Sequence, residues 1–287
     1  MFLSVTYAEP AVWQATIHRV LDLADFARAE RATGGFDTTV WRLERGRQQY
    51  ALRVFRADQR RVLDRELIAL RAAAAAGLPV PRVYAIGCFL QERPALLLEW
   101  CAGQPLAAAV RARPAAILAL GHGFGRLHAR LHRVPAPPGL RTTWIEWGGP
   151  IDAALRQRLL AHTQRRRPRL LHMDWHPLNV LVDHGRPTAI LDWTNAHGGD
   201  PRADVARTLS ILRLSPPRGG TSDRLARRLL EVGWRAGYGS FGPLTAMAPF
   251  YAWAGAAMLY DLRHRFSASE LAHVARWTNV WRSRAGL

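Results

Sequence analysis

The sequence contains no lysine, and cysteine occurs only twice among its 287 residues, as Cys88 and Cys101. Two cysteines exclude a disulfide scaffold and a four-cysteine zinc site, and they fit a reducing compartment. Because lysine is absent, all 40 basic residues are arginine, and with 22 acidic residues the formal net charge is +18. Arginine makes bidentate contacts with phosphate better than lysine does, so this balance favours anionic partners without identifying one.

The sequence also lacks an early basic segment and a long aliphatic run. Its first basic residue is Arg19, so it shows no positive region of a secretory signal peptide. The stretch Ala236–Tyr260 carries no charge, but Pro243 and Pro249 interrupt it, and we expect a loop and a buried helix instead of a membrane span. Hydrophobic residues make up 49% of the chain, which is typical of globular proteins. The sequence therefore predicts a cytoplasmic protein with no membrane partner.

The chain changes character near residue 100. Before that point we expect, in chain order, a short helical lead-in over 1–30, a β-hairpin over 38–56, a helix over 58–76 that ends at Gly77, and strands over 83–86 and 96–99. After it we expect helices over 107–111, 117–133, 150–164 and from 200 to the end, interrupted by short strands over 170–193. The pattern predicts an α+β fold with a strand-rich small lobe over 1–99, a joint at 100–104 and a helical large lobe over 105–287.

The segment that carries the chemistry is a second hairpin in the large lobe. Val180–Val182 and Thr188–Leu191 are apolar and flank a turn, which predicts two buried antiparallel strands. Asn179 begins the first strand and Asp192 ends the second, so the two should lie opposite each other, about 5 Å apart. A carboxylate beside a carboxamide is a hard-oxygen site that suits Mg²⁺. Asp174 lies on the loop that leads into Asn179, where it can meet a substrate hydroxyl near the metal.

Two other interpretations of this segment stay open at this point. His172, Asp174 and His176 alternate along the chain and could instead be ligands of a metallohydrolase. The hairpin could also be purely structural, with incidental polar residues at its ends. The ordered set around the hairpin favours the magnesium interpretation, because a single Asp in a loop would be weak evidence whereas three polar residues at hairpin ends are not.

One ordered set of residues runs through and beyond this hairpin: His172-Met173-Asp174, Asn179, Asp192-Trp193, Gly199-Asp200-Pro201 and Asp204. That order resembles the aminoglycoside phosphotransferase family, the small-molecule branch of the protein-kinase-like two-lobe fold. The resemblance implies an enzyme that uses ATP and Mg²⁺ to phosphorylate a hydroxyl of a small molecule. It makes Asp174 the catalytic base, and Asn179 and Asp192 the metal ligands. His172 would be the structural histidine of the loop, and Asp204 the buried carboxylate that braces the loop from the following helix.

The same resemblance gives roles to residues of the small lobe. Arg53, at the middle of the strand 50–55, stands where protein kinases have the lysine that contacts the α- and β-phosphates, and Glu66 on the next helix would pair with it. Gly34 and Gly35 precede the hairpin, where their backbone amides would cover the phosphates. Arg53 as an edge-strand charge, Glu66 as a helix-surface charge and the glycines as a simple turn remain alternatives.

The joint between the lobes resembles a kinase hinge. Its residues run from Glu99 through Cys101 to Gly103, and the resemblance implies that their backbone binds adenine. Cys101 would then be a hinge residue and not a reactive thiol.

The acceptor is not identified by the sequence. The region 205–287 would hold it, and this region has 12 arginines against four acidic residues. A polycationic aminoglycoside would prefer an acidic pocket, so a neutral or anionic alcohol is an equal candidate. Two other functions are alternatives: a basic nucleic-acid-binding protein, suggested by the run Arg165–Arg169, and a catalytically inactive nucleotide binder. No nucleic-acid-binding motif is present, so we do not expect that partner, and the oligomeric state stays open.

Overall fold

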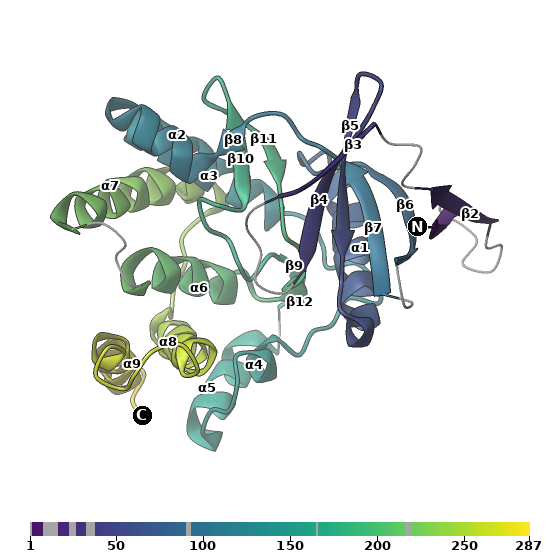
Figure 1. Ribbon diagram of the computed structural model, residues 1–287. Helices are drawn as coiled ribbons and strands as arrows, with labels where there is room; N and C mark the ends of the chain where they lie inside the picture. Colours follow the sequence, from purple (N-terminus) through teal and green to yellow (C-terminus); the bar gives the residue numbers. More distant parts are fainter. Residues whose placement is uncertain are drawn as a thin grey trace.

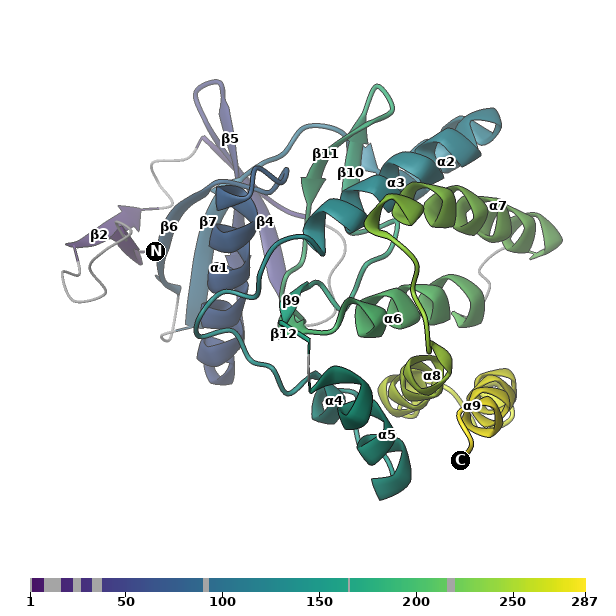
Figure 2. The same ribbon diagram turned by 180° about the vertical axis from the view of Figure 1, so that it is seen from behind.

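The computed structural model describes residues 2–7, 17–22, 27–32, 38–89, 93–164, 166–215 and 220–287. In Figure 1 an antiparallel sheet with one helix against it lies to the right, and the helical part lies to the left and below. Two small sheets join the helices close to the large sheet, as the reverse view in Figure 2 also shows. The predicted α+β class therefore matches the arrangement, while the lobe boundaries at 99 and 105 stay a prediction.

The large sheet has seven strands within the described residues, and every neighbouring pair is antiparallel. Their order across the sheet is β2 (Ile17–Asp22), β1 (Phe2–Tyr7), β6 (Val83–Phe89), β7 (Arg93–Glu99), β5 (Gln48–Val54), β4 (Thr39–Arg45) and β3 (Arg28–Arg31). The predicted hairpin over 38–56 is β4 and β5, joined at a turn where Gly46 adopts a φ of 59°. The two later strands are each longer than predicted, because they pair with each other from Val83 to Phe89.

The predicted helical lead-in over 1–30 is wrong. Its described residues form β1, β2 and β3, which add to both edges of the sheet: β1 pairs with β6, and β3 pairs with β4. β2 and β3 pair with neighbouring strands of the chain, but β1 depends on pairing with β6, more than 70 positions away, and local propensity carries no information about such pairing.

Helix α1 (Arg60–Ala75) follows a short 3₁₀ turn, η2 (Ala57–Gln59), and covers one face of the sheet. Leu63, Leu67 and Leu70 are buried at helical spacing, as predicted, and they belong to the same apolar cluster as Leu96 of β7. The helix ends before Gly77, whose φ of 68° is a conformation that glycine adopts at little cost.

Strand β5 alternates between the two faces of the sheet. Leu52 and Val54 belong to an apolar cluster on the face away from α1. Arg53, between them, contacts Glu66 of α1. Because side chains alternate along a strand, the buried Arg53 guanidinium lies on the face of the sheet that α1 covers.

The helical part contains, in chain order, β8 (Gln104–Pro105), α2 (Leu106–Ala112), η3 (Pro114–Ala116), α3 (Ile117–Leu131), α4 (Trp144–Trp147), α5 (Ala153–Thr163), β9 (Arg169–Leu171), β10 (Val180–Asp183), β11 (Arg186–Ile190), β12 (His197–Gly199), α6 (Pro201–Leu214), α7 (Gly220–Tyr238), η4 (Gly239–Phe241), α8 (Ala248–Leu262) and α9 (Ala272–Arg284). Asp200 caps α6 by accepting the N–H of Arg202. Strand β9 pairs with β12, and β10 pairs with both β11 and β8. The segment between β9 and β10 therefore starts and ends on fixed strands.

Helices α3 and α7 pack unusually close together. A Cβ added at Gly125 would lie 2.0 Å from the carbonyl oxygen of Trp234, and one added at Gly237 would lie 2.0 Å from that of His122. Gly121 and Gly233 make similar approaches one turn earlier on each helix. Only glycine fits these four positions, so the distance between α3 and α7 is fixed by the sequence.

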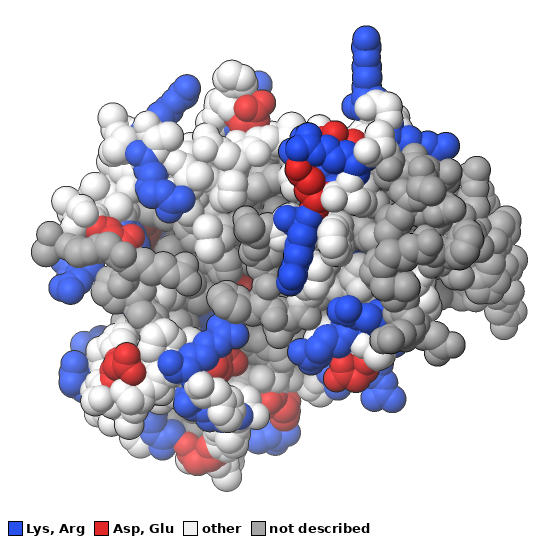
Figure 3. Space-filling model, viewed as in Figure 1, with Lys and Arg blue, Asp and Glu red and all other residues white. Residues whose placement is uncertain are grey.

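The uncharged stretch 236–260 forms the end of α7, a loop and most of α8, in which Phe250 and Trp253 are fully buried. Among the described residues, no helix is both long enough and apolar enough to cross a bilayer. Figure 3 shows one face of the surface, where arginine side chains lie in separate groups, most of them beside acidic side chains.

Candidate active site

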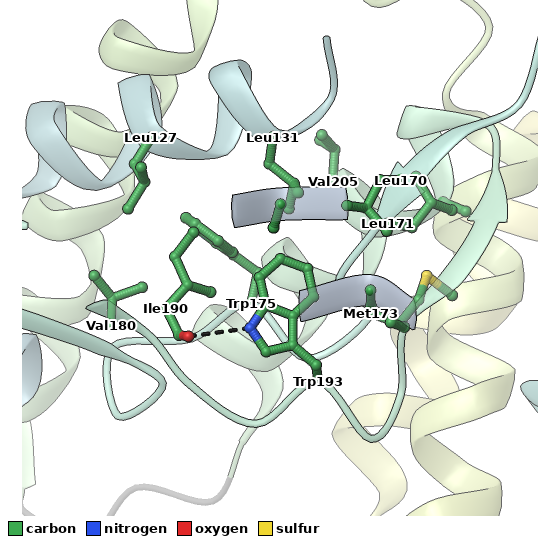
Figure 4. Packing of buried hydrophobic residues seen from close by; sticks show 14 of the residues in the cluster. Leu127, Leu131, Leu170, Leu171, Met173, Trp175, Val180, Ile190, Trp193 and Val205 are labelled. Carbon is green, nitrogen blue, oxygen red and sulfur yellow. Dashed lines mark hydrogen bonds between the residues drawn. The ribbon is translucent and has the colours of Figure 1, made fainter. Parts of the chain in front are cut away.

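The loop 172–179 lies between β9 and β10, and its side chains alternate between the core and the surface. His172, Met173 and Trp175 are fully buried, whereas the Asp174 side chain keeps a quarter of its surface exposed. Trp175 stacks on Phe124 of α3, with ring centres 5.2 Å apart. Figure 4 shows this loop packed on residues of α3, β9, β10 and β11. The buried neighbours hold Asp174 outward on a rigid support.

Asp204 of α6 braces this loop from below. Its Oδ2 accepts the backbone N–H of His172 at 2.6 Å, and its Oδ1 accepts that of Met173 at 3.0 Å. Burial alone would raise the pKa of Asp204, but hydrogen bonds from His128 and His132 hold it well below its usual value. Met173 has a φ of 66°, which costs a non-glycine residue about 1–2 kcal/mol. The bracing carboxylate therefore stabilises a strained turn immediately before Asp174.

The predicted hairpin forms, but it contains a register shift between Leu181 and Val182, and Leu191, the residue before Asp192, lies opposite Asn179. Val180 pairs with Ile190, and the carbonyl oxygen of Asn179 accepts the N–H of Leu191 at 2.8 Å. The side-chain amide of Asn179 donates to the Asp174 carbonyl at 3.0 Å and to its Oδ2 at 3.3 Å. Asn179, Asp174 and the end of β11 are thus brought together in one place.

Asp192 follows directly and adopts a φ of 60°, the second left-handed non-glycine residue of this site. Its Oδ1 accepts hydrogen bonds from Arg53 Nη2 at 2.6 Å and from the Thr194 hydroxyl at 2.8 Å. Burial would raise the pKa of this carboxyl, but the Arg53 guanidinium lowers it to about 2. Thr194 was not predicted from the sequence; a hydroxyl two residues after a ligand-type Asp is the local signal that could have indicated it.

Arg53 joins the large sheet to the hairpin. Besides Asp192 it contacts Glu66 Oε1 through Nη1 at 2.9 Å and the Thr38 hydroxyl through Nε at 3.1 Å. The predicted pairing of Arg53 with Glu66 is present, and the contact with Asp192 is an addition that the sequence did not reveal. Glu66 is 1% exposed, and this burial raises its pKa to about 7 against the opposing effect of Arg53.

The two histidines next to Asp174 have different environments. His172 is buried: its Nδ1 accepts the N–H of Asp174 at 3.3 Å, so its Nε2 carries the proton that is donated to the Leu191 carbonyl at 2.9 Å. Both ring nitrogens are therefore used inside the loop, which removes His172 from any metal-ligand set. His176 Nε2 lies 3.5 Å from Asp174 Oδ2. Burial acts to raise the pKa of Asp174, but His176 keeps it below its usual value.

The other predicted nucleotide contacts are placed as follows. Glu99 ends β7; its backbone N–H donates to the Arg82 carbonyl, and its Oε2 accepts the N–H of Arg82. Cys101 comes two residues later, and burial followed by the nearby Glu99 raises the pKa of its thiol to about 12, so it is not a reactive thiolate. Within the described residues, no backbone hydrogen bond uses the N–H or C=O of Cys101. Gly34 and Gly35 lie outside the described residues.

A hollow of about 330 Å³ lies elsewhere in the helical part. It is lined by Arg166, Arg167, Arg169, Asp200, Pro201, Phe241 and Leu244. Asp200 and Pro201 belong to the motif over residues 172–204, but none of the lining residues was predicted to contact nucleotide, metal or acceptor, so this hollow and the Asp174 site are separate features.

Comparison with known proteins agrees with this geometry. The model of the phosphotransferase enzyme family matches residues 28–241, more than half of the chain. The chain belongs to this family. The family expected from the residues 172–204 is thereby confirmed.

A curated relative in this family is hygromycin-B 4-O-kinase from Escherichia coli, which is 30% identical over 209 residues. The match covers 60% of this chain and 59% of the relative, so the chain matches less than two thirds of that protein's length.

Solved structures of the phosphotransferase type share the fold. The crystal structure of aminoglycoside phosphotransferase APH(4)-Ia superposes with a TM-score of 0.66 at 17% identity, over 92% of this chain and 96% of that chain. A thermostable mutant of the same enzyme, in a ternary complex with AMP-PNP and hygromycin B, also gives 0.66 at 17% identity, over 91% and 95%. At this identity the likeness concerns the fold, and it confirms the protein-kinase-like α+β fold that we expected.

Proposed function

We propose that this phosphotransferase-family protein is an ATP- and Mg²⁺-dependent kinase that transfers the γ-phosphoryl group to a hydroxyl of a small molecule. The grouping of Asp174, Asn179 and Asp192 at one hairpin end, with Arg53 against Asp192, is the observation that carries the proposal. Phosphoryl transfer asks little covalent chemistry of a protein and depends on positioned carboxylates, a metal and a phosphate-binding cation. This site supplies the protein side of each requirement.

The residues present fit a magnesium ion. The Asn179 Nδ2 is committed to Asp174, which leaves Oδ1 as the metal-binding atom of that amide. Asp192 uses Oδ1 for Arg53 and Thr194, and about a third of its side chain is exposed. Mg²⁺ prefers oxygen ligands and typically takes only one or two from the protein, together with substrate phosphates. Once bound, it would supply positive charge to the phosphate oxygens.

Asp174 is the group that we assign to the acceptor hydroxyl. Its lowered pKa keeps it ionised at neutral pH, so it can accept a hydrogen bond from that hydroxyl and hold it in line. A carboxylate with a lowered pKa is a weak base, and it therefore takes the proton late, as the bond to phosphorus forms. Asn179 fixes the direction of the carboxylate by donating to Oδ2 at 3.3 Å.

The nucleotide would lie between β5 and the hairpin. Arg53 offers a guanidinium fork to the α- and β-phosphates, and Glu66 holds that fork in place. The backbone of Cys101 is suited to the adenine edge, because its N–H and C=O are not used by other described residues. The phosphate-covering role of Gly34 and Gly35 stays a prediction.

For the acceptor we propose a neutral or anionic alcohol. The curated relative acts on hygromycin B by its name, but the region 205–287 of this chain carries 12 arginines against four acidic residues. Arg207 of α6 is one of the charges that lower the pKa of Asp174, so a cation already lies near the acceptor position. A polycationic acceptor would meet repulsion there.

A screen of ADP release tests this function. Hygromycin B, neutral sugars, amino alcohols and anionic alcohols would be offered with ATP and Mg²⁺, and we expect turnover with a neutral or anionic member. Asp174→Asn should lower that turnover by about 10²–10⁴-fold while ATP binding is retained. Asp183→Asn, at the exposed end of β10, is the matched control and should leave turnover unchanged. Near-normal turnover of Asp174→Asn would contradict the assignment.

The nucleic-acid alternative has less support. On the face shown in Figure 3 the arginines alternate with acidic side chains instead of forming one basic field. Retention on DNA that falls steeply with added salt would favour that alternative, whereas an ATP-dependent thermal shift favours the kinase.

A further inference from the structure

Four buried polar side chains meet behind the 172–179 loop, and the function proposed above uses only one of them. His128 comes from α3, His132 directly follows that helix, Asp204 comes from α6 and Tyr238 from α7, and none is more than 4% exposed. Ligand-type atoms of His128, His132 and Asp204 lie within 4.8 Å of one another. This composition fits either a metal centre or a network of hydrogen bonds, and the proton positions distinguish the two.

Hydrogen-bond roles argue against a metal. The indole N–H of Trp234 can only donate, and it lies 3.3 Å from His128 Nδ1, so that nitrogen accepts. Burial lowers the pKa of His128 to about 3, which keeps the ring neutral with its proton on Nε2, 3.5 Å from Asp204 Oδ2. His132 Nε2 lies 3.2 Å from the same carboxylate oxygen and must donate to it. Both nitrogens nearest the carboxylate thus carry hydrogens and offer no lone pair to a cation.

The remaining nitrogen of His132 extends the network to α7. Because Nε2 carries the proton, Nδ1 accepts, and the Tyr238 hydroxyl donates to it at 2.6 Å. One directed chain results: the Tyr238 hydroxyl donates to His132, His132 donates to Asp204, and Asp204 accepts the N–H groups of His172 and Met173. With one proton on the His132 ring, this is the only arrangement that satisfies every link.

We infer that Tyr238 and His132 are positioning residues of the phosphoryl transfer. They fix the orientation of the Asp204 carboxylate, and this carboxylate fixes the strained backbone of Met173, directly before Asp174. A rotated carboxylate would lose one of the two backbone hydrogen bonds and release the turn that aims Asp174. The inference rests on the proposed function, because it assigns these residues to the same reaction.

The packing of α3 against α7 makes this hydrogen-bond network rigid. Gly125 and Gly237 let the two helices touch backbone to backbone, and a Cβ at Gly125 would lie 2.7 Å from the N atom of Tyr238 itself. Tyr238 therefore has no freedom to follow a moving His132. The position of α7 therefore determines the position of the 172–179 loop, through the hydrogen bonds from Tyr238 to His132 and from His132 to Asp204.

Tyr238→Phe is the most specific test, because it removes one oxygen atom and leaves the ring. His132 Nδ1 then loses its hydrogen-bond donor, so the imidazole ring is held only at Nε2 and can rotate, which frees the Asp204 carboxylate to rotate with it. We expect kcat to fall about 10-fold, the low end of the range for residues that orient a functional group from behind. KM for ATP should stay unchanged, because Arg53 and Asp192 do not belong to this hydrogen-bond network.

A double-mutant cycle with His132 separates the network from general damage. His132→Leu removes both links and should lower kcat at least as much as Tyr238→Phe. If the two act only through each other, adding Tyr238→Phe to His132→Leu has no further effect on kcat. His132→Gln retains one donor and one acceptor and should recover part of the lost activity. Strict additivity in the cycle would overturn the inference.

Thr278→Val is the matched control. It removes a buried hydrogen bond from Thr278 to the Val274 carbonyl, in α9 and outside this network. It should lower the thermal midpoint to a similar extent without changing kcat. Equal losses of kcat in Thr278→Val and Tyr238→Phe would show that stability alone governs activity, and the positioning role would then be wrong.

A measurement that needs no acceptor separates failure of this inference from failure of the proposed function. Imidazole nitrogen NMR shifts of ¹⁵N-histidine-labelled protein report the tautomer and the hydrogen bonds of each nitrogen. We expect the proton of His132 at Nε2 in the parent, and a changed Nδ1 shift in Tyr238→Phe because that nitrogen loses its hydrogen-bond donor. The absence of turnover with every alcohol would remove the function but leave this result. A stoichiometric metal in the purified parent, lost in His132→Gln, would instead establish a metal centre and overturn the network.

Discussion

Asp192 and Asp204 both have a pKa below the usual value, but their partners are of opposite kinds. About a third of the Asp192 side chain is exposed, and it is held by the side chains of Arg53 and Thr194. Asp204 is fully buried and is held by two backbone N–H groups and by the imidazole of His132. Side-chain partners can move aside for a cation and phosphate, whereas backbone partners cannot leave without moving the loop.

The difference suggests a division of work between the two carboxylates. We propose that the Asp192 end of the site exchanges partners during a catalytic cycle, with Asp192 releasing Arg53 as a metal ion and phosphate bind. The Asp204 end stays constant and holds the strained Met173 turn. Four changes would break or sharpen this comparison, beginning with the constant end.

Asp204→Ala should have the largest effect on folding. It leaves the N–H groups of His172 and Met173 buried without an acceptor, at about 1–3 kcal/mol each. We expect the free energy of unfolding to fall by about 2–6 kcal/mol in urea denaturation, with loss of activity. Asp192→Ala should lose much less stability. Equal stability of Asp204→Ala and the parent would show that the hydrogen bonds of Asp204 to the loop backbone do not stabilise the fold.

Asp192→Ala should mainly affect nucleotide binding. The change removes a proposed metal ligand, so kcat/KM should fall by about 10²–10³-fold and the thermal shift produced by ATP with Mg²⁺ should shrink. Asp183→Ala at the exposed end of β10 serves as the control. If ATP with Mg²⁺ stabilises Asp192→Ala as much as the parent, the metal assignment is wrong.

Arg53 and Glu66 should be energetically coupled. Arg53→Ala should lower kcat/KM for ATP, Arg53→Lys should give an intermediate value because the charge stays and the fork is lost, and Glu66→Ala should show a smaller defect. A double-mutant cycle should give a coupling of about 0.5–3 kcal/mol. Additive losses would mean that the buried ion pair does not orient Arg53 for the nucleotide.

Glu66→Gln should change how stability depends on pH. Burial raises the folded pKa of Glu66 to about 7, above its unfolded value, so between about pH 4.5 and 7 the unfolded chain releases a proton that the folded chain keeps. The contribution of protonated Glu66 to the free energy of unfolding is therefore complete at low pH and is lost as the pH rises through 7.

The comparison of parent and Glu66→Gln isolates that contribution, because other titrating groups are common to both. The parent should lose stability relative to the variant with a slope of at most about 1.4 kcal/mol per pH unit in this range. Parallel stability curves from pH 4.5 to 7 would show that Glu66 is already ionised in the folded protein.

Much of the site could be predicted because its parts are close in sequence. The hairpin places Asn179 opposite the start of the Asp192 segment by strand register alone, and the spacing of Arg53 and Glu66 follows from one strand and one helix. The contact of Arg53 with Asp192 joins residues 139 positions apart, and no local pattern encodes it.

The rest of the fold escaped prediction for the same physical reason. Strand β1 forms through pairing with β6, which lies far along the sequence. The contact of Tyr238 with His132 and that of His132 with Asp204 need α3, α6 and α7 to be in place. A signal for part of this was present: glycines recur at a spacing of four on both α3 and α7, and such a pattern allows close helix contact.

The choice of arginine at position 53 has a consequence for chemical probes of this protein. Many covalent reagents for nucleotide sites acylate a lysine amine, and this chain contains no lysine anywhere. The guanidinium of Arg53 keeps its proton and is not acylated under those conditions. Such reagents should pass over this site, and a dicarbonyl reagent selective for arginine should modify the exposed arginines before Arg53, because the Arg53 side chain is only 10% exposed.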